Sequence, residues 1–389
     1  MVATYKVDKK VLAWAIESSS NDIVSLQNKF PKIEIWLSES SEISIGNIQK
    51  LSKMLNIPFG YFFLNDIPQE EVSIANYRTI DNERYHELSR DLLETIYEME
   101  RKQEFVRLSR VKDGFDPLPI VGRFNKNTDF MTIASDIREV LGLSIDWNQK
   151  VDRPYNVLRD YLNKVGILVF KNGIVKSNTH RNLNLEEFRA FVLIDEYAPL
   201  IFINAKDSQT AQLFSLCHEL AHIWLGVPEL LNTFNQDFNE QIENKELERL
   251  CNQVAAEILL PKIQIKKLFN KDYTIDTIQT VAHCLGISPQ VVAIKLRQEE
   301  SLSSEQFELV YKEVVKYANE NLNHKKKNGD RGGNFYITAL SRLDHSFVNL
   351  VNKKTSTGEL LYTDAFDMLN ISTGDTFDNL INKIGVKHG

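Results

Sequence analysis

Apolar side chains surround a predicted helix at residues 214–226, FSLCHELAHIWLG. Gly226 and Pro228 mark its end, because glycine accepts the left-handed conformation that closes a helix and proline cannot continue one. A helix that is apolar on most of its sides is buried in a protein core. We therefore expect this segment at the centre of its domain.

A second buried helix is predicted at residues 245–260, where one inward face recurs at helical spacing. The face is formed by Glu248, Asn252, Ala255, Ala256 and Leu259. It therefore combines small apolar residues with one carboxylate and one amide.

Three short apolar runs before these helices have the composition of β-strands. They are residues 166–170, 188–195 and 199–204. A helix predicted at 155–165 precedes them, and a compact helix pair around Gly286 follows the second buried helix. The pattern predicts an α+β fold that is mostly α-helical, with a small sheet near the central helix.

Short helices are predicted through residues 1–68. Asp8 is placed to cap a helix that carries Val11, Leu12, Trp14 and Ala15, and a second helix is expected near 22–30. A long, highly charged helix is predicted at 82–112, and a further one at 128–142. The long helix has one apolar stripe, made by Leu88, Leu92, Ile96 and Met99.

The C-terminal part is predicted as a basic surface loop followed by helices. The loop is HKKKNGDR at 324–331, and the helical segments are 332–351 and 360–372. Five parts result. They are a helical domain at 1–68, a helical spacer at 69–149, an α+β domain at 150–270, a helical extension at 271–323 and a helical appendage at 324–389.

Composition narrows the classes of function. The chain has 389 residues, 43% of them hydrophobic, and a net charge of −7, so it suits two or three domains with their own cores and argues against broad phosphate-driven nucleic-acid binding. Neither a secretory leader nor a membrane-spanning segment is predicted, so we expect a cytoplasmic protein. Three cysteines are too few for a disulfide framework. Reduced thiols are expected, and a redox-sensing role for Cys217 and Cys251 stays open.

The central helix carries His218, Glu219 and His222 in the pattern H-E-x-x-H. At about 100° per residue the two histidines lie one turn apart on one face, so their imidazoles can converge on a zinc ion. Glu219 is rotated toward the open coordination position, where it can act as general base toward water. The alternative is that the pattern arises by chance and both histidines are hydrogen-bonded core residues.

Zinc in a catalytic site needs a third protein ligand, and Glu248 on the second buried helix is the best candidate. Asn252 lies one turn further along and can orient a ligand by a hydrogen bond. Two other carboxylates of this helix are less suitable, because they point to other sides of it. Glu257 is about half a turn out of phase with Glu248, and Glu246 is rotated nearly as far about the helix axis in the other direction.

The two motifs resemble those of the ImmA/IrrE family of zinc metallopeptidases. HELAHIWLG is followed, 30 residues after its first histidine, by ERLCNQVAAEILLP, where the family commonly has E-x-x-A-N-x-F-A-A-x-L-L-M-P. The resemblance implies a zincin-like domain with zinc ligands at His218, His222 and Glu248 and the base at Glu219. The sequence departs from the family pattern at Cys217, Cys251, Val254 and Leu260, none of which is a proposed ligand or base.

The N-terminal segment resembles the XRE-type helix-turn-helix module that precedes the peptidase in long members of this family. IEIWLSES stands where the family has a W-E-x-G-like turn, and IPFGYFFL matches its closing segment. Reading DNA needs cations or amides on the second helix, and this region instead has Glu34, Glu39 and Glu42. We therefore favour a docking or structural role over specific DNA binding. The helix pair around Gly286 could be a second nucleic-acid reader or a core cap, and His283 on it is expected to be structural.

The leading hypothesis is a zinc endopeptidase that cleaves a protein partner. The resemblance implies a cognate transcriptional repressor, cleaved under stress or in the control of mobile elements. The alternative is a non-hydrolytic regulator or antitoxin-like protein that uses the peptidase fold as a scaffold. The sequence identifies neither the substrate, the activating signal, the residue that stabilises the oxyanion, nor the oligomeric state.

Overall fold

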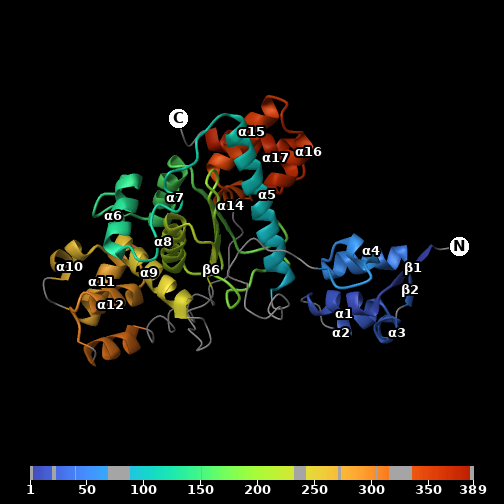
Figure 1. Ribbon diagram of the computed structural model, residues 1–389, viewed down its shortest axis with the longest axis horizontal. Coiled ribbons are helices and arrows are strands. Elements are labelled where there is room, and N and C mark those ends of the chain that lie inside the picture. Colours follow the sequence, from blue (N-terminus) through green and yellow to red (C-terminus); the bar gives the residue numbers. More distant parts are fainter. Residues whose placement is uncertain are drawn as a thin grey trace. The chain divides into compact units, whose positions relative to one another are not determined.

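The structure, a computed structural model, divides into two compact units (Figure 1). The units are residues 1–98 and 99–389, and the boundary falls within helix α5 (Arg90–Lys112). The structure describes residues 3–19, 23–39, 41–68, 88–149, 151–231, 242–269, 273–303, 305–314 and 335–385. The boundary lies inside the predicted spacer at 69–149, and the finer division into five parts stays a prediction.

Short helices around an apolar core form the first unit. They are α1 (Lys9–Glu17), α2 (Ile23–Lys29), α3 (Ile33–Ser38), α4 (Ile45–Leu55) and the 3₁₀ helix η1 (Phe59–Phe63). Asp8 caps α1 as predicted, accepting a hydrogen bond from the backbone N–H of Lys10 at 2.8 Å. Residue 22, the first of the predicted second helix, lies outside the described residues.

The first unit also contains two strands that the sequence analysis did not predict. β1 (Thr4–Val7) pairs antiparallel with β2 (Ser41–Ser44), which directly precedes α4. The expectation of helices alone was therefore wrong here. Four residues are too few for the period-2 alternation that identifies a strand, and the serine-rich β2 looked like a turn.

Helix α5 corresponds to the charged helix predicted at 82–112, but it begins at Arg90: residues 88 and 89 are not helical, and residues 82–87 lie outside the described part of the chain. The predicted stripe is buried, with at most 4% of any of its side chains exposed. Its members are Leu88, Leu92, Ile96 and Met99. One apolar face is enough to hold this otherwise polar helix against its neighbours.

A four-stranded sheet forms the middle of the second unit, in the order β3-β5-β4-β6. β3 (Leu168–Asn172) runs parallel to β5 (Leu200–Asn204), while β4 (Ala190–Leu193) runs antiparallel to both β5 and β6 (Glu229–Leu231). The first three strands were predicted. β6 was missed because its three residues show no alternation.

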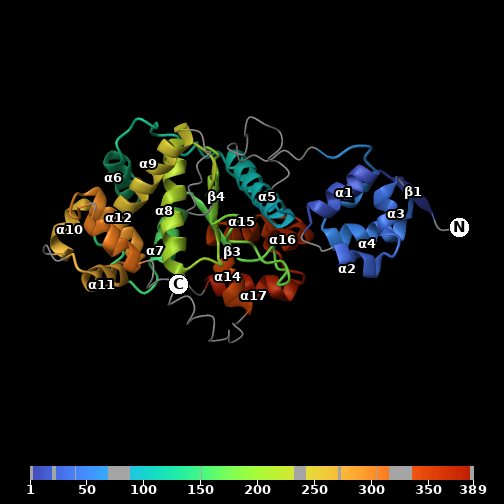
Figure 2. The same cartoon turned by 90° about the horizontal axis from the view of Figure 1, so that it is seen from below.

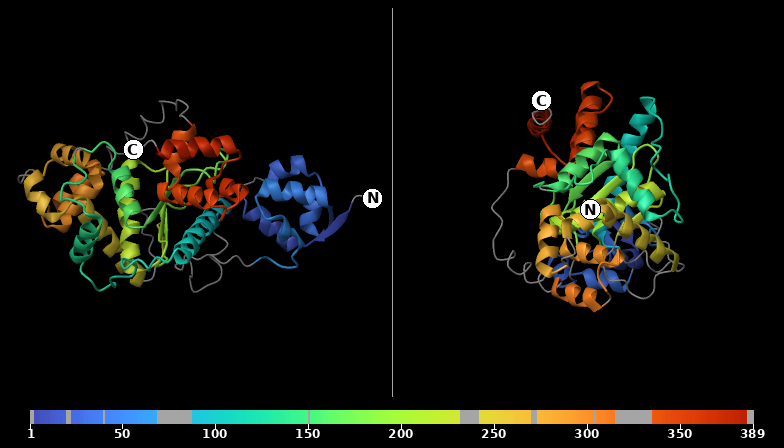
Figure 3. Two further views of the ribbon diagram at one scale, coloured as in Figure 1. Left: turned by 90° about the horizontal axis from the view of Figure 1, so that it is seen from above. Right: turned by 90° about the vertical axis from the view of Figure 1, so that its left-hand side faces the viewer.

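Helices cover both faces of this sheet. Helices α7, α8 and α9 lie on one side, and the C-terminal helices, drawn in red, lie on the other (Figure 2, Figure 3). The helices on the first side and beside it are α6 (Phe130–Leu141), α7 (Pro154–Lys164), α8 (Gln209–Leu225), α9 (Ile242–Leu259), α10 (Lys262–Phe269), α11 (Ile275–Leu285) and α12 (Pro289–Gln298). The predicted helix pair around Gly286 is α11 and α12. Among the described residues, no single helix is long and apolar enough to cross a bilayer. Helices α11 and α12 reach that length and composition only when they are counted together, and they are bent by 111° at the break between them.

The C-terminal part contains four described helices where two segments had been predicted. They are α14 (Phe335–Arg342), α15 (His345–Ser356), α16 (Tyr362–Leu369) and α17 (Gly374–Gly385). The segment 332–351 is not one helix, because Asp344 is extended and caps α15. The predicted loop at 324–331 lies outside the described residues.

Asp344 joins these helices to the sheet. Its side chain is fully buried and accepts hydrogen bonds from the backbone N–H groups of Val169 at 2.8 Å and Phe347 at 2.9 Å. The side chains of Asn163 and Ser346 donate to it as well. Phe347 then packs against Phe170 on β3, with ring centroids 5.3 Å apart. One carboxylate therefore caps α15 and occupies a backbone donor of β3.

Replacing Asp344 by alanine should lower the free energy of unfolding by about 3 kcal/mol, because it leaves several buried donors without an acceptor. Urea unfolding followed by circular dichroism would measure this. Asp364→Ala, which removes an exposed carboxylate from α16, is the matched control and should change stability by no more than about 0.5 kcal/mol. Equal effects of both changes would contradict the role given to Asp344.

Candidate metal centre

Helix α8 carries the H-E-x-x-H residues through the core of the second unit. Ser208 caps its N-terminus by accepting a hydrogen bond from Ala211, and Gly226 ends it with a φ of 67°. The helix is five residues longer at its N-terminal end than predicted. His218, Glu219 and His222 are all 0% exposed, so the polar groups of the motif face protein rather than solvent.

The C-terminal end of α8 is fixed by a segment about a hundred residues earlier in the chain. The backbone N–H groups of Gly122 and Phe124 donate to the carbonyl oxygens of Ile223 and Trp224, both at 3.0 Å. A Cβ atom on Gly226 would lie 2.9 Å from the Cα atom of Gly122, so this contact requires glycine. The turn of α8 that holds His222 is thereby held in place.

Helix α9 brings the third candidate residue to α8. The C-terminal carbonyl groups of α9 accept hydrogen bonds from the side chains of Trp147 and Asn148, at 3.2 and 3.1 Å. Asn148 also donates to Leu285 at the end of α11. These bonds satisfy carbonyl groups that a helix end leaves without intrahelical partners, and they hold α9 along its axis.

Glu248 on α9 meets both histidines of α8. Its carboxylate oxygens lie 3.2 Å from Nε2 of His218 and 3.3 Å from Nε2 of His222. The two Nε2 atoms are 3.1 Å apart, and the three residues each offer a ligand atom within 4.8 Å of the others. The structure therefore brings together the three side chains that the sequence analysis selected as ligands.

Asn252 supports this arrangement from the same helix. Its Oδ1 atom lies 3.1 Å from Nδ1 of His218. When this amide oxygen accepts a hydrogen bond from Nδ1–H of His218, Nε2 is the ring nitrogen that remains to contact Glu248 or to bind a cation. Asn252 thus lies within hydrogen-bonding distance of His218, and its role in orienting a metal ligand stays a prediction.

The cluster has the chemistry of a cation site. Burial acts to raise the pKa of Glu248, but its contacts with His218 and His222 outweigh burial and hold that pKa well below its usual range. Burial lowers the pKa of His222, which keeps its imidazole neutral. An ionised carboxylate and two imidazole lone pairs this close repel one another unless a proton or a metal ion lies between them. Two nitrogens and one oxygen are the donor set typical of catalytic zinc.

The rival residues lie elsewhere. Glu257 forms an ion pair with the buried Lys295 on α12, and Glu299 accepts from the same ammonium group at 2.6 Å. Glu246 is exposed on α9, and His283 is exposed on α11.

Two cysteines neighbour the cluster in sequence. Cys217 and Cys251 are both buried, and burial raises the pKa of the Cys217 thiol, so that thiol stays protonated. A redox-sensing role for either cysteine, which the sequence leaves open, is not tested by the structure.

Several groups that position the site escaped the sequence analysis. Gly122, Asn148 and Asp136, which accepts a hydrogen bond from the indole of Trp224 at 2.8 Å, come from segments far away in sequence. No motif marks them, because each acts through a single backbone or side-chain contact. Only the tertiary fold reveals them.

Comparison with known proteins covers two parts of the second unit. Residues 343–383 match a model described as a domain of unknown function (DUF8813). No curated protein matches the chain. Residues 162–297, about a third of the chain and including both helices of the cluster, match the peptidase family M78 model described as the IrrE N-terminal-like domain. This match supports the ImmA/IrrE resemblance and indicates a metallopeptidase-like domain.

Proposed function

We propose that this chain is a zinc-dependent endopeptidase that cleaves a protein partner. The observation that carries the proposal is the convergence of His218, His222 and Glu248 within 4.8 Å, on two helices of a domain that matches a peptidase family. His218, His222 and Glu248 would hold the zinc ion. Zinc in such a site supplies Lewis acidity that makes water a nucleophile near neutral pH.

Glu219 is the proposed general base. It follows His218 on α8 and is fully buried in the same part of the core, so its carboxylate works in surroundings of low polarity. It would accept a proton from the attacking water and deliver it to the leaving amine. Asn252 would keep His218 in the tautomer that leaves Nε2 free, through the 3.1 Å contact at Nδ1.

The family resemblance supports a cognate transcriptional repressor as the substrate. The scissile bond would then lie in a segment of that repressor that can extend into the site. The resemblance also supports a role in stress response or in the control of mobile elements.

The assignment of ligands predicts a ranking of zinc affinities. His222→Ala and Glu248→Gln should each weaken zinc binding by at least about a hundredfold, because two ligands remain of three. Asn252→Ala should weaken it by roughly ten- to a hundredfold, as loss of a ligand-orienting group does. Competition with a chromophoric chelator, together with elemental analysis, gives the affinity and the stoichiometry.

Two carboxylates of the same helix are controls for this ranking. Glu246→Gln changes an exposed residue and should leave both zinc affinity and stability unchanged. Glu257→Gln should lower stability, because it weakens the contact with buried Lys295, but it should keep one zinc per chain. Zinc lost from the Glu257 variant and kept in the Glu248 variant would refute the choice of ligand.

The role of Glu219 predicts a separation of binding from chemistry. Glu219→Gln should keep zinc and fold but lower the hydrolysis rate by at least about a hundredfold, because an amide cannot accept the proton. A diverse peptide library incubated with each protein, with new N-termini identified by mass spectrometry, requires no knowledge of the substrate. If the zinc-loaded wild-type chain yields no cleavage products beyond those of the Glu219 variant, the proposed mechanism fails and the binding-regulator alternative is favoured.

A further inference from the structure

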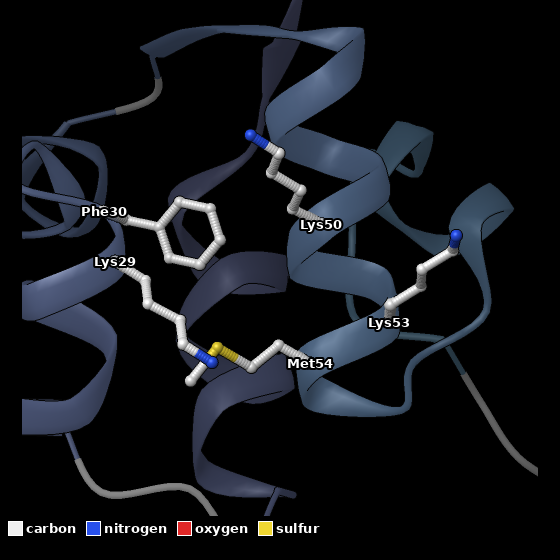
Figure 4. Close-up of a pocket in the computed structure, with 5 residues that line it drawn as sticks. All are labelled: Lys29, Phe30, Lys50, Lys53 and Met54. Carbon is white, nitrogen blue, oxygen red and sulfur yellow. The ribbon is translucent and has the colours of Figure 1, made fainter.

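A hollow of about 510 Å³ lies on the first unit, between the end of α2 and the outer face of α4 (Figure 4). Its lining residues are Lys29, Phe30, Lys50, Lys53 and Met54. Lys29 and Lys50 lie on either side of the Phe30 ring in this view, and the ends of the Lys29 and Met54 side chains overlap in it. The volume falls within the range of about 300–1,000 Å³ that takes a small ligand or a few side chains of a partner.

The charge of this hollow is unbalanced. Lys29, Lys50 and Lys53 are exposed, and no described carboxylate lies within ion-pair distance of any of them. Two acidic side chains of this unit that do not line the hollow have hydrogen-bond partners of their own. Glu34 accepts a hydrogen bond from Gln27 at 2.6 Å, and Glu42 accepts one from Thr4 at 2.8 Å. The hollow therefore presents a positive potential in a protein whose net charge is negative.

The hollow also has an apolar base. Phe30 is 5% exposed and packs against Trp36, with ring centroids 6.1 Å apart, so its ring is held firmly. Met54 is partly buried and packs against the same core. A thioether adapts its shape to different apolar groups, which suits it to a surface that receives a side chain.

We propose that this hollow is a docking site for an acidic segment of the protein partner, with one large apolar side chain placed over Phe30 and Met54 and flanking carboxylates placed near the lysines. The inference rests on the proposed function only in taking the partner to be the substrate. The hollow combines three unpaired cations with an apolar base, and this combination supports an acidic peptide as the ligand. A phosphate backbone would need only the cations, so the apolar base would have no role in binding it.

Duplex DNA fits this unit less well. In a helix-turn-helix the second helix enters the major groove, and here α3 carries Glu34 in its first turn and is followed by Glu39 at its C-cap. Trp36 of α3 is buried in the core and not free to contact a base. Carboxylates on that helix would repel phosphates, whereas the lysines lie on α2 and α4 around a concave surface.

Binding can be measured with the full-length chain carrying Glu219→Gln, so that no peptide is consumed. The probe is a short fluorescein-labelled peptide in which glutamate and aspartate flank one phenylalanine. Fluorescence anisotropy should show saturable binding that weakens as sodium chloride is raised, because exposed charges are screened. Replacing the acids by their amides should abolish binding, and replacing phenylalanine by serine should weaken it.

Two matched double variants test the location. Lys29→Gln with Lys50→Gln should weaken peptide binding by about three- to tenfold, as loss of two charge contacts predicts. Lys6→Gln with Lys10→Gln removes the same charge from exposed positions of this unit that do not line the hollow, and binding should stay within roughly twofold. All four positions are exposed, so both variants should fold, which circular dichroism verifies.

Two outcomes would overturn the proposal. Equal weakening by both pairs would show attraction by general charge and not docking at the hollow. Labelled duplex DNA that binds more tightly than the peptide, and loses affinity with the Lys29 and Lys50 changes, would make the hollow a phosphate site. Neither outcome affects zinc content or peptide-library cleavage, so docking and peptidase activity can fail separately.

Discussion

The packing of α8 against α9 is the constraint on which the candidate site depends. His218 and His222 come from one helix and Glu248 from the other, so their ligand atoms meet only when both helices have the correct rotation and height. Each helix is fixed near its C-terminal end by hydrogen bonds from distant backbone or side chains. Gly122 and Phe124 hold α8, while Trp147 and Asn148 hold α9.

Helix α9 is also fixed about its own axis. Glu248 faces the histidines on one side, and Glu257, about half a turn away, reaches buried Lys295 on the other. Rotation of the helix would break both contacts at once. Burying Lys295 is costly unless its charge is paired, so its contact with Glu257 favours one orientation of α9, while Glu299 at the end of α12 pairs with the same ammonium group.

The sequence was sufficient to predict those parts of the candidate site that depend on residues close to one another along the chain. Histidines four residues apart on an apolar helix, and a carboxylate in phase with small residues on a second helix, are set by helical geometry alone. The strands β1, β2 and β6 were missed because they have three or four residues each. Gly122, Asn148 and Asp344 were missed because their partners lie about a hundred or more residues away, where no periodicity connects them.

The hydrogen bond from Val169 to Asp344 has a consequence for how the sheet can meet another polypeptide. A strand at the edge of a sheet normally offers its backbone groups to any extended chain that approaches. On β3, a backbone donor is already occupied by Asp344 and the face of the strand is covered by Phe347. Among the described strands, β6 forms the opposite edge, pairs only with β4, and begins four residues after α8 ends. Among the described edges, strand addition is therefore favoured at β6, next to the helix that carries His218 and His222, over β3.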